Sequence, residues 1–292
     1  MKTSIIVTCF NHEKYVKQSL DSILENLIPG LELIICDDCS SDNSVAIISK
    51  WIQNHTNQFD RISFLQHHKN YGVTHSLNEL IAECRGELIS PLSGDDYYIN
   101  GAIKSRRDAL AYNPDWLGGF NDGVAFGNNN EIYTKSLVKH SNINVAACLG
   151  KGIREEVVMN WSAPMNLQFW RRVAFKSHGG DFEFNENIFA EDLNFALWAL
   201  SSNSFGYLNK ICYAYRCRTW PQSLQGDMTL KWLQMAYLFG KHSNYFEENI
   251  KNCMLSRADY YYSLSINNAD RISINYDRFI KSVSNLASQR PV

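Results

Sequence analysis

Two pairs of neighbouring aspartates, Asp37-Asp38 and Asp95-Asp96, each stand just after an apolar run of the sequence. Two carboxylates a few ångströms apart repel each other and raise each other's pKa unless a cation neutralises them. A hard divalent ion such as Mn²⁺ or Mg²⁺, with open positions for phosphate oxygens, would offset that repulsion. The pair Asp95-Asp96 therefore suggests a metal site, although aspartates after a glycine are also common in turns.

Polar residues follow all four apolar runs in the first part of the chain. The clusters are Thr8-Cys9-Phe10-Asn11, Asp37-Asp38-Cys39-Ser40, Asn70-Tyr71-Gly72 and Asp95-Asp96. A further acidic pair, Glu191-Asp192, begins an amphipathic helical pattern, where a carboxylate gains from the helix N-terminus. Simple helix capping explains that pair equally well. The clusters are the places where chemistry is expected.

Alternating periodicities indicate the elements that must position these residues. Strand-like runs cover Ser4–Phe10, Leu31–Cys36, Arg61–His67 and Glu87–Leu92. Helical patterns lie between them: one begins at Val16 and stops at Pro29-Gly30, one carries a stripe from Val45 to Ile52, and one runs from about Thr74 to Cys84. Ser40, Ser41 or Asp42 is available as N-cap of the second helix. Gly118-Gly119 and Gly179-Gly180 are expected to be turns.

This order of elements implies right-handed βαβ units. We therefore predict an α/β fold with a mostly parallel central sheet flanked by helices, whose ligands bind at the carboxyl ends of the strands. The predicted divisions are residues 1–97, a nucleotide-binding half; residues 98–225, an acceptor-binding half; and residues 226–292, a helical C-terminal segment.

Composition excludes several classes of protein. The chain has 292 residues, of which 45% are hydrophobic and 20% charged, as in ordinary globular proteins. A formal charge of -2 makes nucleic acid an unexpected partner. The opening MKTSIIVTCFNHEKY does not fit a signal peptide and no apolar stretch is long enough to cross a membrane, so a cytoplasmic protein with free thiols is expected. Contact with the inner face of the cytoplasmic membrane stays open.

The ordered motifs resemble those of the inverting family 2 glycosyltransferases, whose nucleotide-binding half has the GT-A fold. The resemblance covers roughly residues 3–223. Its motifs are SIIVTCFNHEKYVKQSLDSIL at Ser4–Leu24, IICDDCSSDNS at Ile34–Ser44, NYGVTHSLN at Asn70–Asn78, SGDD at Ser93–Asp96, Gly179-Gly180, and AED at Ala190–Asp192. Each is short, but their order and spacing together are specific.

The resemblance implies a site for a nucleotide diphosphate sugar, with uracil or thymine as base. Phe10 would lie on the face of the pyrimidine, and Asp38 would accept a hydrogen bond from the imide N–H of the base. Asp96 would ligate Mn²⁺ or Mg²⁺ and Asp95 would contact ribose or metal. The other residues expected to bind the nucleotide are Thr8, Asn11, Asn70, Gly72, Arg216 and Arg218.

The resemblance also implies the reaction. Asp192, with Glu191 beside it, would be the general base that removes a proton from the acceptor hydroxyl, and one direct displacement would invert the anomeric configuration. Arg218 stands where many relatives carry a histidine, which puts the ligand set of the metal in doubt because an arginine cannot bind a cation. The implied acceptor is a glycan or lipid-linked glycan, in surface polysaccharide synthesis.

Three alternatives remain at the level of sequence. Cys36 and Cys39 form a C-x-x-C between a strand and a helix, as in thioredoxin-like redox sites. A sugar-phosphate nucleotidyltransferase would keep the fold, but TCFNHEKY lacks the glycines of its phosphate loop. A binding module that has lost catalysis is the third. A zinc site is not expected, because no second cysteine pair has comparable spacing.

Overall fold

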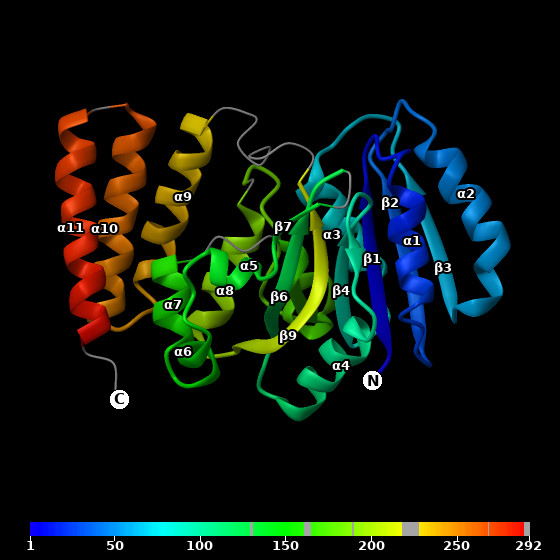
Figure 1. The fold of residues 1–292 in the computed structure, drawn as a ribbon, viewed down its shortest axis with the longest axis horizontal. Helices are drawn as coiled ribbons and strands as arrows, with labels where there is room; N and C mark the ends of the chain where they lie inside the picture. The colour runs from blue at the N-terminus through cyan, green and yellow to red at the C-terminus, as the bar shows by residue number, and fades with distance from the viewer. Residues whose placement is uncertain (129–130, 161–164, 189, 218–227, 268, 289–292) are drawn as a thin grey trace.

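The computed structural model describes residues 1–128, 131–160, 165–188, 190–217, 228–267 and 269–288. One nine-stranded sheet runs through them in the order β3-β2-β1-β4-β8-β6-β9-β5, with β7 paired to β6 (Figure 1). The strands are β1 Thr3–Cys9, β2 Leu31–Asp37, β3 Arg61–Gln66, β4 Leu88–Ser93, β5 Tyr97–Tyr98, β6 Gly118–Phe126, β7 Ile132–Thr134, β8 Gln168–Arg171 and β9 Phe205–Arg216.

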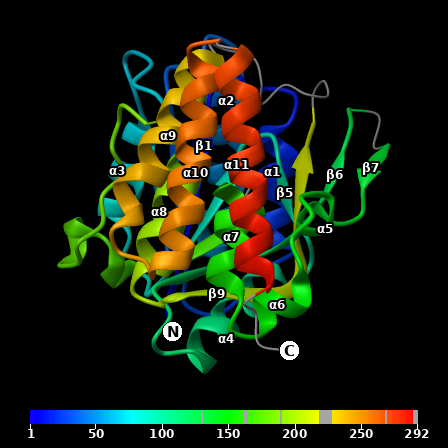
Figure 2. The same ribbon diagram turned by 90° about the vertical axis from the view of Figure 1, so that its left-hand side faces the viewer.

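The first half of the sheet is parallel: β2 pairs with β3 and β1, and β1 pairs with β4, all in the parallel direction. Helices α1 (Val16–Leu24) and α2 (Ser44–His55) contact each other on one face, and α3 (Val73–Glu83) packs on β1 and β2 from the other (Figure 2). The predicted strands and helices are confirmed. The predicted N-cap of α2 is wrong, because Asn43 and not Ser40, Ser41 or Asp42 has that position. The Asp42 carboxylate still accepts a hydrogen bond from the amide of Ser44 at 2.9 Å.

The second half of the sheet is mixed. Strand β8 is antiparallel to β4 and β6, β6 is parallel to β9, and β5 is antiparallel to β9. The prediction that Gly118-Gly119 forms a turn is wrong, because both residues open β6. A Cβ atom on Gly118 would come within 2.8 Å of the Phe195 ring and 2.9 Å of the Phe169 carbonyl oxygen, so close packing explains the glycine. Gly179 has a φ of +87° and does form the expected turn.

The remaining helices surround this second half and extend it. They are α4 Ala102–Tyr112, α5 Leu137–His140, α6 Val145–Leu149, α7 Ile153–Asn160, α8 Glu191–Ser201, α9 Met228–Ser243, α10 Glu248–Ser265 and α11 Ala269–Ser288, with 3₁₀ turns at Thr56–Gln58, Met165–Leu167, Arg172–Ala174 and Lys176–His178. Helices α9, α10 and α11 pack side by side at the end of the molecule opposite β3, as the predicted helical C-terminal segment requires (Figure 1).

A cluster of aromatic side chains fixes α8 against the sheet. The Phe195 ring of α8 lies 5.6 Å from Trp170 of β8, 5.6 Å from Phe175 and 4.9 Å from Phe182, measured between ring centroids. Pairs of this kind contribute about 0.5–1.5 kcal/mol each beyond their buried area. The N-terminus of α8 therefore has a defined position relative to β8 and β4. Within the described ranges, no helix is both long enough and apolar enough to cross a membrane.

Glu32 connects several strands at the amino-terminal edge of the parallel sheet, opposite the edge formed by the carboxyl ends of the strands. Its carboxylate accepts hydrogen bonds from Ser4 Oγ at 2.5 Å, from the amides of Arg85 and Gly86 at 2.5 and 3.0 Å, and from Arg61 Nη1 at 3.3 Å. Burial by itself would raise the pKa of Glu32, but these donors outweigh it and lower the pKa below its ordinary 4.5. The carboxylate therefore connects β1, β2, β3 and the segment that leads into β4.

We expect Glu32→Gln to lower the free energy of unfolding by about 2 kcal/mol at pH 7, because it replaces a charged acceptor of several hydrogen bonds. Because the pKa of Glu32 is lower in the folded than in the unfolded protein, its carboxylate stabilises the fold fully at a pH above the unfolded pKa. This stabilisation is lost as the pH falls through the folded-state pKa of Glu32. The difference between variant and wild type should therefore shrink below about pH 4.5. Urea unfolding at pH 7, 5 and 4 measures the free energy of unfolding, with Glu87→Gln, an exposed position, as control. If both variants lost the same free energy of unfolding at pH 7, the role of the Glu32 hydrogen bonds would be contradicted.

Candidate active site

A pocket of about 230 Å³ opens at the carboxyl ends of β1, β2 and β4. Its lining residues are Thr8, Cys9, Phe10, His12, Asp38, Asn70, Gly72, Val73, Ser76 and Ser93. Five of them, Thr8, Phe10, Asp38, Asn70 and Gly72, are residues that the sequence predicts to bind a nucleotide. The Phe10 side chain is 42% exposed, unusual for an aromatic residue at the end of a buried strand, and can take a planar ligand on its surface.

The Asp38 carboxylate organises one wall of this pocket. Asp38 Oδ1 accepts a hydrogen bond from the Tyr71 amide at 2.8 Å and Oδ2 accepts one from the Gly72 amide at 2.8 Å. His67 Nδ1 lies 2.7 Å from Oδ1. Burial tends to lower the pKa of His67, but Asp38 and Glu79 raise it above the usual 6.5. A carboxylate offers about four lone-pair sites, so three donors leave one for a ligand.

The loops after β1 and β2 are joined by reciprocal hydrogen bonds. Asp37 binds the amide and hydroxyl of Ser40 at 2.8 and 2.6 Å, and so has the turn-forming role that aspartate often takes. The Asn11 amide donates to Ser40 Oγ at 2.8 Å, and Asn11 Oδ1 accepts from the Ser41 amide at 2.9 Å. Asn11 has a φ of +55° and does not line the pocket. Its contacts position the neighbouring Phe10.

The structure distinguishes Asp95 from Asp96. Asp96 is 2% exposed, and its two oxygens accept hydrogen bonds from the Tyr213 hydroxyl and the Arg216 amide, both at 2.7 Å. Burial, together with the neighbouring Asp95, raises the pKa of Asp96 well above its ordinary value. The side chain of Asp95 is 17% exposed and its Oδ1 lies 3.9 Å from His12 Nε2. Asp95 is therefore the more accessible carboxylate of the pair.

These residues fit a hard divalent cation. The carboxylate oxygens of Asp95 are the donor type that Mn²⁺ and Mg²⁺ prefer, and a nearby positive charge would offset the repulsion that raises the pKa of Asp96. Asp96 is the less available ligand, because it is buried and both of its oxygens already accept hydrogen bonds from the Tyr213 hydroxyl and the Arg216 amide.

The Arg216 side chain makes several contacts within the protein. Its Nε donates to the Asp95 carbonyl oxygen at 2.8 Å and its Nη2 to Gln18 Oε1 at 2.6 Å. The guanidinium carbon lies 4.5 Å from the ring centroids of both Tyr15 and Phe126. Arg216 thus holds β9 against the loop that carries Asp95, and its contact with a nucleotide stays a prediction. Arg218 lies outside the described residues.

Asn166, just before β8, and Gln168, the first residue of β8, link the aspartate pair to the second acidic pair. Asn166 Nδ2 lies 3.4 Å from Asp96 Oδ2, and two residues later Gln168 Nε2 donates to the Asp192 carbonyl oxygen at 2.8 Å. Asp192 Oδ1 accepts from the Leu193 amide at 2.7 Å. Glu191 Oε2 is buried with no hydrogen-bond partner among the described residues, and burial followed by repulsion from Asp192 raises the pKa of Glu191 to about 8.

Sequence reasoning missed His67, Asn166 and Gln168. The sequence pattern places His67 at the end of the strand run at residues 61–67, and its position next to the end of β2 is the signal that points to Asp38. Asn166 and Gln168 carry no local signal, because their contacts depend on the antiparallel register of β8 with β4. A larger cavity of about 540 Å³ between α7, α8 and α10 contains none of the predicted site residues.

The redox interpretation of Cys36 and Cys39 is wrong. Cys36 is fully buried, and burial first, then the carboxylates of Glu79 and Asp38, raise its pKa to about 12. Redox-active cysteines have lowered thiol pKa values, because the thiolate is the reactive form. No disulfide joins the two residues.

Comparisons with known proteins identify the family of the chain. Residues 4–150 match the model of the family "Glycosyl transferase family 2". A beta-1,3-glucosyltransferase of Campylobacter jejuni that acts on GalNAc(5)-diNAcBac-PP-undecaprenol is 30% identical over 219 residues, which are 74% of this chain and 64% of that protein. The putative glycosyltransferase EpsE of Bacillus subtilis is 33% identical over 95 residues, 32% of this chain and 33% of EpsE. The matches thus span less than two thirds of these relatives.

Two solved structures share the fold. Residues 1–349 of TarS from S. aureus, in complex with UDP-GlcNAc, superpose with a TM-score of 0.68 at 20% identity, covering 100% of this chain and 82% of that one. The mannosyltransferase PcManGT of Pyrobaculum calidifontis, in complex with GDP-Man and Mn²⁺, gives a TM-score of 0.62 at 14% identity, with 100% and 76% coverage. The α/β fold of the GT-A type and the family resemblance are both confirmed, and the chain belongs to glycosyl transferase family 2.

Proposed function

We propose that the protein is an inverting glycosyltransferase that moves a sugar from a UDP-linked donor to an acceptor hydroxyl. The observation that carries this proposal is the pocket at the carboxyl ends of β1, β2 and β4, which holds the exposed Phe10 and the Asp38 carboxylate. Asp95 Oδ1 lies 3.9 Å from Nε2 of the pocket residue His12. UDP-GlcNAc in the TarS complex, which has the same fold, supports this choice of donor. Membership of the family disfavours the nucleotidyltransferase alternative.

The base would be recognised by stacking and one directional hydrogen bond. Phe10 supplies the apolar face, and Asp38 Oδ2, which accepts one protein hydrogen bond, keeps acceptor capacity for an imide N–H. Cytosine has no N–H at that position, so the contact favours uracil. Thr8, Asn70 and Gly72 complete the rim, where the absence of a side chain at Gly72 leaves space beside Asp38.

We assign metal binding to Asp95, with Mn²⁺ or Mg²⁺ as the ion, and a supporting role to Asp96. When bound, the ion neutralises the diphosphate as it leaves. Asp96 fixes the turn through the Tyr213 hydroxyl and the Arg216 amide, and Arg216 fixes the backbone of Asp95. This reverses the order in which the sequence ranked the two aspartates.

Asp192 is our candidate for the general base. A pKa of about 8 keeps Glu191 protonated at neutral pH, so Glu191 is a poor base there. Pairs of carboxyl groups whose environments separate their pKa values commonly divide the roles of acid and base. Gln168 and the Leu193 amide orient Asp192, which would take the proton of the acceptor hydroxyl as that oxygen attacks the anomeric carbon.

The acceptor we propose is a glycan or lipid-linked glycan, since the Campylobacter relative is named for an undecaprenol-linked one. Residues 1–97 would then bind the donor, residues 98–225 the acceptor, and residues 226–292 would buttress the acceptor half through the contact of α9 with α8. A lipid-linked acceptor would place the protein at the cytoplasmic face of the membrane in polysaccharide synthesis.

Calorimetry with UDP tests the donor site. We expect Mn²⁺ to tighten UDP binding by about tenfold or more, equivalent to about 1.4 kcal/mol. Asp95→Asn should lose that gain, because an amide is a far weaker metal ligand than a carboxylate, while the exposed Asp115→Asn should keep it. Equal affinity with and without the ion in the wild type would remove the main support for the proposal.

Transfer assays test the base. Asp192→Asn should lower the turnover number by about 10²–10⁴, the usual contribution of a general base, and leave the Kd for UDP within about twofold. Glu191→Gln should cost much less, because glutamine resembles the protonated acid. The exposed Asp181→Asn serves as control. Unchanged turnover in Asp192→Asn would show that another group accepts the proton.

A further inference from the structure

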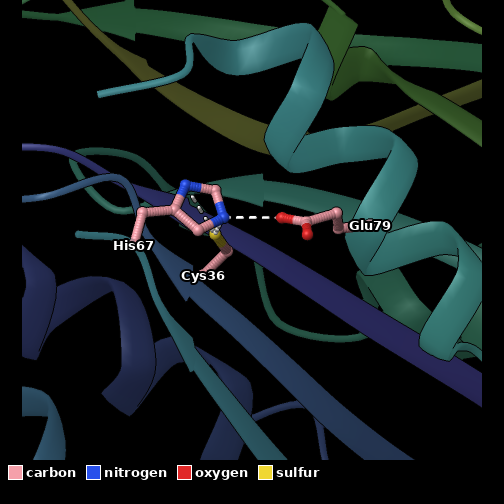
Figure 3. A group of neighbouring side chains, drawn as sticks. All are labelled: Cys36, His67 and Glu79. Carbon is pink, nitrogen blue, oxygen red and sulfur yellow. Dashed lines mark hydrogen bonds and ion pairs between the residues drawn. The ribbon is translucent and has the colours of Figure 1, made fainter. Parts of the chain in front are cut away.

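The His67 side chain lies between two carboxylates, one at each nitrogen of its ring. His67 Nδ1 is 2.7 Å from Oδ1 of Asp38, which follows β2, and His67 Nε2 is 2.6 Å from Oε2 of Glu79 on α3 (Figure 3). The His67 side chain is 8% exposed, whereas Asp38 lines the pocket of the candidate active site. His67 can therefore act on that pocket through Asp38.

The two contacts together define the protonation state of the ring. An ionised carboxylate only accepts hydrogen bonds, and a neutral imidazole has one N–H and one acceptor nitrogen. A neutral ring would therefore turn its acceptor nitrogen toward either Asp38 or Glu79, whereas an imidazolium donates from both nitrogens. The separations of 2.7 and 2.6 Å are as short as charge-assisted N–H···O bonds, which measure about 2.7–2.9 Å.

The groups around the ring favour the imidazolium form. Burial on its own lowers the pKa of His67, but hydrogen bonds and negative charge from Asp38 and Glu79 outweigh burial and raise that pKa above 6.5. The Cys36 sulfur lies beside the ring, 3.4 Å from Nε2, and adds no charge, because burial first and then nearby carboxylates raise the thiol pKa to about 12. Further titratable groups beside His67 are Asp37 after its amide contact, His75 on α3, and His68, Lys69 and Tyr71 in the following loop.

The contact with His67 determines which oxygen of Asp38 stays available. Oδ1 faces His67 Nδ1 and also accepts a hydrogen bond from the Tyr71 amide, while Oδ2 accepts one from the Gly72 amide. Two donors on Oδ1 leave the remaining acceptor capacity of the carboxylate on Oδ2. The proposed contact with the imide N–H of the base uses Oδ2, so its direction depends on the bond between His67 and Asp38.

We propose that His67, held as an imidazolium by Asp38 and Glu79, is a positioning residue for recognition of the nucleotide base. Its Nδ1–H fixes the Asp38 carboxylate in the orientation that receives the imide N–H of uracil, and Glu79 fixes the ring through Nε2. His67 itself does not touch the base. The inference rests on the proposed function, because the contact between Asp38 and the base is part of that function.

Two substitutions of His67 separate its two hydrogen bonds. The side-chain amide of asparagine reaches the place of Nδ1 and that of glutamine the place of Nε2, so only His67→Asn keeps a donor for Asp38. We expect His67→Gln to weaken UDP binding by about tenfold and His67→Asn by about threefold or less. CDP has no imide N–H, so both variants should bind it within about twofold of the wild type, and the exposed His68→Gln should keep both affinities.

The pH dependence of binding and the spectrum of the ring test the protonation state. A neutral ring has one N–H for two carboxylates, so the ratio of UDP affinity to CDP affinity should fall as the pH rises through the folded-state pKa of His67, above 6.5. Glu79→Gln should move this fall to lower pH, because it removes one carboxylate that stabilises the imidazolium. In the wild type, ¹⁵N NMR at pH 7 should show both ring nitrogens of His67 protonated, a result that requires no variant to fold.

The possible outcomes separate this inference from the proposed function. A neutral His67 ring at pH 7, or a His67→Gln variant that keeps the wild-type preference for UDP over CDP, would overturn the inference and leave the proposed function standing. Equal losses of UDP and CDP binding in His67→Gln and His67→Asn would also overturn it, because they would show a purely structural role. Equal affinity of the wild type for UDP and CDP would contradict the proposed base contact, and this inference with it.

Discussion

The pocket wall depends on the need to satisfy one nearly buried carboxylate, that of Asp38. A carboxylate removed from water requires hydrogen-bond donors, and here they come from the loop between β3 and α3 and from His67. The hydrogen bonds from the Tyr71 and Gly72 amides fix the point at which α3 begins. Gly72 is the N-cap residue of α3 and has a φ of +91°. One side chain at the end of β2 thereby determines the shape of the next loop and leaves a single acceptor position facing the pocket.

Asp96 and Arg216 have the corresponding role on the other side of the pocket. The turn after β4 brings the carboxyl groups of Asp95 and Asp96 together. Two donors from β9, the Tyr213 hydroxyl and the Arg216 amide, bind the Asp96 carboxylate, although β9 is far from this turn in the sequence. Because the Arg216 side chain also contacts Gln18 and Tyr15, it joins the parallel half of the sheet to the mixed half. Arg216 thereby adds to the β4–β8 pairing that already joins the two halves.

These dependencies explain what the sequence could predict. The four parallel strands follow from apolar runs and breakers, and Phe10, Asp38 and Gly72 share a pocket because the carboxyl ends of parallel strands share an edge. The unequal exposure of Asp95 and Asp96 could not be predicted, since neighbouring residues in a turn point in different directions. Asn166 and Gln168 were missed because the register between β8 and β4 is a tertiary contact with no local period. Gly118-Gly119 was misread because a glycine selected for close packing resembles one selected for a turn.

The two edges of the sheet treat their buried acids in opposite ways. At the amino edge, Glu32 accepts hydrogen bonds from several donors, and its pKa is lowered. At the other edge, burial and a neighbouring carboxylate raise the pKa values of Asp96 and Glu191, so negative charge there costs stability. Such a cost is tolerable where a cation, a proton or a substrate arrives to relieve it, because binding then recovers the free energy that folding gave up. The two acids whose burial costs stability, Asp96 and Glu191, thus stand directly beside the residues to which we assign metal binding and proton transfer, Asp95 and Asp192.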